Sequence, residues 1–72
     1  MKKLINELKN LGFDTVENNK YIDLYLNDEI IATINLNNTN CADIAESCTF
    51  EMLSEELQDK IYKLVLDTIK KF

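Results

Sequence analysis

The spacing of hydrophobic positions changes from a helical period to a strand period and back along the chain. Over residues 2–11 the apolar side chains recur at helical spacing, with polar residues between them: Leu4, Ile5, Leu8 and Leu11. Gly12 follows, where the C-terminus of a helix favours a left-handed residue. The pattern predicts a short amphipathic helix over residues 2–11.

From residue 13 to residue 36 apolar and polar residues alternate, which predicts antiparallel strands joined by tight turns. The Asn18-Asn19 pair suits a two-residue turn because Asn tolerates positive φ. For the next turn, a three-residue loop over 27–29 pairs Leu24 with Ala32 and keeps the apolar set on one face, so we predict that loop. The predicted inner face consists of Phe13, Ile22, Leu24, Leu26, Ile30, Ala32, Ile34 and Leu36.

The predicted outer face is more apolar than a solvated sheet face usually is. Its members are Val16, Tyr21, Asp23, Tyr25, Ile31, Thr33 and Asn35. Tyr and Thr are good strand formers, and scattered apolar side chains are ordinary on protein surfaces. The alternative is that Val16, Tyr21, Tyr25 and Ile31 form a patch that meets a partner or a second copy.

The last segment has the clearest helical pattern. Ser54 is a good N-cap, and Glu55 and Glu56 lie in the first turn, where the helix dipole favours carboxylates. The apolar stripe consists of Leu57, Ile61, Leu64, Val65, Thr68, Ile69 and Phe72. Tyr62 and Leu66 add a second apolar row, so we expect this helix to touch more than one surface.

Residues 41–53 are ambiguous, because their apolar positions fit both helical spacing and strand alternation. Residues 37–40 read as a loop. With 72 residues, 46% of them hydrophobic, one Gly and no Pro, the chain is predicted to form a single domain over 1–72. We predict an α+β fold with a short N-terminal helix, an antiparallel β-meander of three to four strands, and a long C-terminal helix packed on one sheet face.

The residues needed for common catalytic sites are missing. The chain has no His and only two Cys, so neither a zinc ligand set nor a Cys nucleophile with its usual base can be assembled. One Gly cannot build a phosphate-binding loop. We therefore predict no enzymatic activity, no metal and no cofactor. A net charge of −5 without any Arg disfavours direct nucleic-acid binding.

The charges are strongly segregated along the sequence. Residues 21–59 contain nine carboxylates and no Lys, whereas all eight lysines lie outside that window. Such a field attracts basic protein surfaces. We predict a protein-binding acidic surface formed by Asp43, Glu46, Glu51, Glu55, Glu56 and Asp59. The alternative is that these carboxylates only form a solvated, solubilising surface.

Residues 22–34 and 53–67 resemble small uncharacterised proteins of phages and prophages of Gram-positive bacteria. The matching sequences are IDLYLNDEIIATI and LSEELQDKIYKLVLD. The usual C-terminal tail motif of those proteins has no counterpart here. The resemblance implies an α+β fold and an origin in a phage or mobile element, and it implies no activity. It also favours a strand over 41–47 followed by a helical turn near 50–53.

Two functional hypotheses follow. The first is a non-enzymatic phage or mobile-element protein that binds a basic surface of a host protein, for example an inhibitor of a nucleic-acid-handling defence enzyme, as anti-CRISPR proteins are. The second is a small homodimeric interaction module. Its self-association surface would comprise Val16, Tyr21, Tyr25, Ile31, Tyr62 and Leu66. No apolar stretch approaches the ~20 residues of a membrane helix and no signal peptide is recognisable, so we expect a cytoplasmic protein in a bacterial host.

Overall fold

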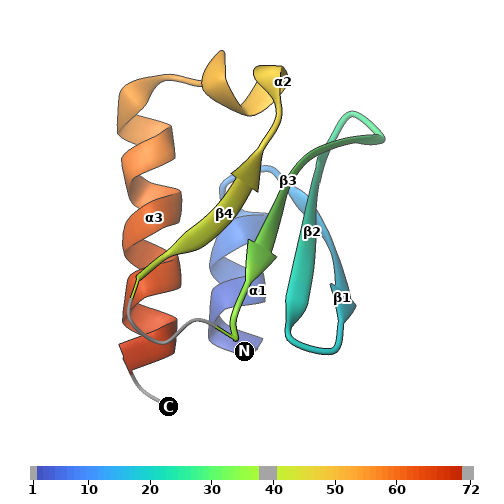
Figure 1. The fold of residues 1–72 in the computed structure, drawn as a ribbon. Helices are drawn as coiled ribbons and strands as arrows, with labels where there is room; N and C mark the ends of the chain where they lie inside the picture. Colours follow the sequence, from blue (N-terminus) through green and yellow to red (C-terminus); the bar gives the residue numbers. More distant parts are fainter. Residues whose placement is uncertain (1, 38–40, 71–72) are drawn as a thin grey trace.

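The computed structural model describes residues 2–37 and 41–70 of the chain. Its elements, in chain order, are α1 (Lys2–Asn10), β1 (Asp14–Asn18), β2 (Tyr21–Leu26), β3 (Glu29–Asn35), β4 (Asp43–Glu46), α2 (Cys48–Glu51) and α3 (Glu55–Lys70) (Figure 1). The predicted α+β fold is confirmed, including the strand within 41–47. The helical turn after that strand begins at Cys48, two residues earlier than expected.

The four strands form one antiparallel sheet in the order β1-β2-β3-β4, so each strand pairs with its neighbour in sequence. α1 and α3 pack against one face of the sheet and contact each other. The core lies between these two layers and is formed by Leu4, Leu8, Phe13, Ile22, Leu24, Ile31, Ala32, Ile34, Leu36, Phe50, Ile61, Val65 and Ile69. No described helix covers the other face of the sheet.

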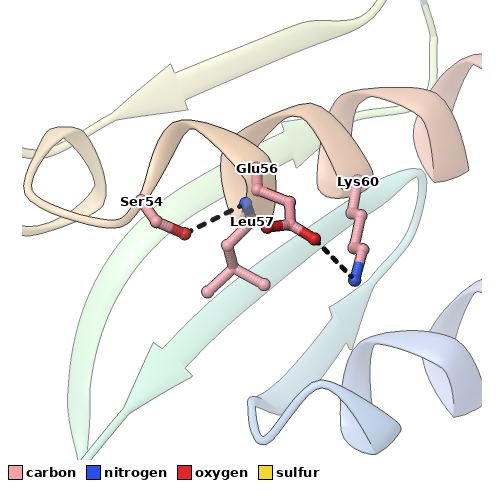
Figure 2. A network of polar contacts seen from close by, with 4 residues as sticks. All are labelled: Ser54, Glu56, Leu57 and Lys60. Carbon is pink, nitrogen blue, oxygen red and sulfur yellow. Dashed lines mark hydrogen bonds and ion pairs between the residues drawn. The ribbon is translucent and has the colours of Figure 1, made fainter.

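The C-terminus of α1 and the N-terminus of α3 lie where the sequence predicts. Gly12 has φ +99°, and its amide donates to the carbonyl of Lys9 at 3.0 Å, which closes α1. At the start of α3, the Ser54 hydroxyl accepts a hydrogen bond from the Leu57 amide at 3.2 Å (Figure 2). Of the predicted α3 stripe, every described member is buried or half-buried, and Phe72 lies outside the described residues.

The predicted register between β1 and β2 is wrong by two positions. The predicted Asn18-Asn19 turn would pair Val16 with Tyr21. In the structure the turn consists of Asn19 and Lys20, with Asn19 at φ +56°, and Val16 pairs with Asp23. Two adjacent Asn residues tolerate positive φ equally well, so the sequence alone did not decide between them. Because a shift of two positions keeps each side chain on its face, the predicted faces of these strands hold.

The predicted loop between β2 and β3 is also wrong. The structure has a two-residue turn in which Asn27 and Asp28 have φ of +53° and +64°, as a type I′ turn requires. Leu26 pairs with Glu29, which is the first residue of β3. Positive φ costs less at Asn and Asp than at Glu. The two-residue turn is therefore favoured over the three-residue loop, which would place Glu29 at positive φ.

A β-bulge in β3 restores the predicted pairing of Leu24 with Ala32. Tyr25 pairs with Ile30, and the next pair is Leu24 with Ala32, so Ile31 is the extra residue. Ile31 is fully buried, while Ile30 is 45% exposed. The predictions that placed Ile30 on the inner face and Ile31 on the outer face are therefore both wrong. Ile31 belongs to the core and takes no part in a self-association surface.

Candidate protein-binding surfaces

One end of the molecule is strongly acidic. The β2–β3 turn, the end of β4, α2 and the start of α3 all lie at this end, because antiparallel strands alternate in direction (Figure 1). These segments carry seven exposed carboxylates, which we call the acidic end: Asp28, Glu29, Glu46, Glu51, Glu55, Glu56 and Asp59.

Hydrogen bonds hold the segments of the acidic end together. The Thr49 hydroxyl on α2 donates to a carboxylate oxygen of Glu29 on β3 at 3.3 Å. The side-chain amide of Gln58 on α3 donates to the backbone carbonyls of Glu51 at 3.2 Å and Leu53 at 2.8 Å. These bonds hold the end of α2 against α3. The fold therefore sets the backbone positions from which these carboxylates project, and it holds the Glu29 carboxylate directly.

The structure brings together five of the six carboxylates that the sequence predicted as a binding surface. Asp43 is the exception, because it begins β4 and lies three residues, about 10 Å, from Glu46. Asp43 instead accepts a hydrogen bond from the Asn35 side chain at 3.1 Å. Sequence reasoning missed Asp28 and Glu29 as members of the acidic end, since only the pairing of β3 with β4 places their turn beside α2.

Few cations neutralise the acidic end. Lys60 lies 3.7 Å from Glu56 one turn further along α3, and both side chains are largely exposed, so this pair contributes little stability (Figure 2). Among the described residues it is the one ion pair that the structure forms. Most carboxylates of the acidic end therefore face solvent without a paired cation.

An exposed methionine interrupts the acidic end. Met52 follows α2 directly and is 85% exposed, the highest value of any large apolar side chain in the described residues. Its sequence neighbours include Glu51 and Glu55. A flexible apolar side chain bordered by charges is typical of the centre of a protein interface, where Met is enriched and charges form the rim.

The uncovered sheet face combines aromatic and acidic side chains. From the strand pairing, its members are Asp14, Val16, Asn18, Tyr21, Asp23, Tyr25, Ile30, Thr33, Asn35, Asp43 and Ala45. Val16 and Tyr21 are exposed, as the sequence predicted, and Ile30 takes the place predicted for Ile31. Three aspartates and no lysine lie on this face.

The flank of α3 is largely used within the chain. Tyr62 donates a hydrogen bond to the Glu46 carboxylate, and its ring meets Phe50 edge-on with centroids 6.3 Å apart. Leu66 is half-buried against the core. The predicted self-association residues Tyr62 and Leu66 thus offer less free apolar surface than the sequence suggested.

Two of the hollows in the described part of the surface lie between secondary-structure elements. One, of about 330 Å³, lies between α1 and α3, and its lining includes Glu7, Lys60, Lys63 and Asp67. The other, of about 210 Å³, is open and lies beside the bulge, between β3 and β4. Across residues 2–37 and 41–70, no three Cys, Asp or Glu side chains are grouped to hold a metal ion. None of the described helices has the length and apolarity to cross a membrane.

Comparison with protein-family models, curated proteins and solved structures gives no match to this chain.

Proposed function

We propose that this chain is a non-enzymatic binding protein whose acidic end docks on a basic surface of another protein. The supporting observation is that four separate segments converge to present seven exposed carboxylates at one end of the fold. Charges arranged in this way accelerate association with a basic partner and disfavour acidic ones. Met52, which directly follows Glu51 in the chain, supplies an exposed apolar side chain beside these carboxylates.

The partner class that fits is a protein with a basic surface that holds phosphate groups. Surfaces that bind nucleic acids are rich in Lys and Arg, and carboxylates at fixed positions can occupy them in place of phosphates. The resemblance to phage and prophage proteins extends this proposal to an inhibitor of a host enzyme that handles nucleic acid, such as a defence nuclease.

Matched charge-reversal variants test the proposal. Glu51→Lys with Glu55→Lys changes the acidic end, while Glu17→Lys with Asp67→Lys makes the same change in net charge at exposed positions elsewhere. The parent and both variants are used as bait in lysate of a Gram-positive host, in about 0.05 M and about 0.5 M salt, with captured proteins identified by mass spectrometry. We expect a basic protein retained by the parent and by the Glu17/Asp67 variant at low salt, and lost by the acidic-end variant.

Stability must be followed beside binding, because Lys at position 55 loses about 0.3–1 kcal/mol of helix-dipole stabilisation. Thermal melts separate this loss from a loss of binding. Equal capture by both folded variants would show that the acidic end only solubilises the protein.

A homodimeric module is the second candidate. The exposed Val16, Tyr21 and Ile30 on the uncovered sheet face favour it. Pairing this face with its own copy would however bring its aspartates close to those of the copy, which opposes association at neutral pH. Light scattering decides: a dimer at micromolar concentration, with a mass unchanged between low and high salt, would support the module and argue against a charge-steered partner.

A further inference from the structure

We propose that Tyr21, Asp23 and Tyr25 on the uncovered sheet face form a receptor for an arginine side chain of a protein partner. This inference rests on the proposed function for the class of partner, a basic protein, and assigns a second contact region distinct from the acidic end.

The geometry follows from the strand pairing. Tyr21, Asp23 and Tyr25 alternate along β2, so all three side chains leave the same face, with Asp23 about 7 Å along the strand from each tyrosine. Across the sheet, Val16 and Thr33 flank Asp23 on either side. The neighbours of the Asp23 carboxylate on this face are therefore two tyrosines, one apolar side chain and one hydroxyl.

Asp23 is held in place but not neutralised. The Thr33 hydroxyl donates to its Oδ1 atom at 3.0 Å, which fixes the orientation of the half-buried carboxylate. No described lysine forms an ion pair with Asp23. A fixed, partly desolvated carboxylate without a cation is suited to accept one from outside the chain.

The two tyrosine rings favour arginine as that cation. A guanidinium group is planar, stacks on aromatic faces and donates two parallel hydrogen bonds to a carboxylate, whereas an ammonium group makes a single point contact. The other members of this face that carry charge, Asp14 and Asp43, add attraction for a cationic segment. Asp14, Asp23 and Asp43 together would repel the same face of a second copy of the chain, which argues against self-association here.

The test uses the whole chain and a peptide of four Arg-Gly repeats as the probe, with a Lys-Gly peptide of equal length for comparison. Amide chemical shifts report where each peptide binds. We expect the Arg peptide to shift the amides of β2 and to bind several-fold more tightly there than the Lys peptide. Asp23→Asn, which still accepts the Thr33 hydrogen bond, should weaken this binding about tenfold. Glu17→Gln removes an equal charge from neighbouring β1 and should change the affinity for the Arg peptide less than about twofold.

The outcomes separate this inference from the proposed function. Shifts confined to the acidic end, or an Asp23→Asn variant that binds as the parent does, would overturn the arginine receptor and leave the acidic-end proposal standing. β2 amides that broaden with protein concentration in the absence of peptide would identify a self-interface instead and also overturn it. The capture experiment with the acidic-end variants decides the proposed function independently, because neither of its substitutions lies on the sheet face.

Discussion

Ser47 ties the β-bulge at Ile31 to the start of α2. The Ser47 amide and hydroxyl both donate to the carbonyl oxygen of Ile31, at 3.0 Å and 2.8 Å. The same hydroxyl accepts a hydrogen bond from the Phe50 amide at 3.4 Å, as an N-cap does. Phe50 is fully buried in the core. The backbone and side chain of this one residue thus pair the Ile31 carbonyl at the bulge and fix the turn that places the Phe50 ring in the core.

Replacing Ser47 by Ala should therefore cost about 2 kcal/mol of unfolding free energy, since a net hydrogen bond contributes about 0.5–1.5 kcal/mol and an N-cap about 1 kcal/mol. Ser54→Ala is the matched control, because it removes a single exposed capping bond to Leu57 and should cost about 1 kcal/mol. Urea unfolding measures both. The faster amide exchange expected at Phe50 should appear in the first variant alone. A larger loss for Ser54→Ala would contradict the bridging role of Ser47.

The adjacent isoleucines 30 and 31 should respond in opposite ways to truncation. Ile31→Ala empties a fully buried position and should cost about 2–5 kcal/mol. Ile30→Ala changes an exposed position and should stay within about 0.5 kcal/mol. In a strand with the three-residue loop and no bulge, Ile30 would be buried and Ile31 exposed, so Ile30→Ala would cost more than Ile31→Ala. Denaturant unfolding of the two variants therefore tests the bulge directly.

The layout of the fold could be predicted because it follows from hydrophobic period and helix caps. Gly12 and Ser54 mark the helix ends in the sequence and do so in the structure. The pairs of Leu24 with Ala32 and of Ile22 with Ile34 also follow from keeping apolar residues on one face.

The bulge and the acidic end could not be predicted in full. In a regular strand, successive side chains point to opposite faces, so alternation does not predict two consecutive buried residues such as Ile31 and Ala32. The apolar pattern is instead fitted by a loop that is one residue too long. The membership of Glu29 in the acidic end depends on its contact with Thr49, twenty residues away in the sequence. Charge spacing along the chain carries no information about such a contact.

The type I′ turn between β2 and β3 can be improved by one substitution. Asp28 has φ +64°, a conformation that Gly adopts without strain, and Asn-Gly is the preferred sequence for this turn. Asp28→Gly should stabilise the fold by about 0.5 kcal/mol after the larger entropy of Gly in the unfolded chain is subtracted. Asp28→Asn removes the same charge while keeping a residue that tolerates positive φ, so it controls for electrostatics. Equal thermal stability of the two variants would argue against strain at this position.

Gly12 offers a measurement of backbone strain that is nearly free of side-chain contacts. A methyl group at this position would meet no atom within 4 Å beyond the two adjoining residues of the chain, so a clash with packed side chains does not contribute. Its φ of +99° nevertheless lies where residues other than Gly are strained. Gly12→Ala should therefore cost about 1 kcal/mol, and Gly12→Asn less, because Asn visits positive φ more readily. Urea unfolding of both variants provides the comparison. An alanine variant as stable as the parent would mean that α1 does not end in the left-handed turn that brings Phe13 into the core.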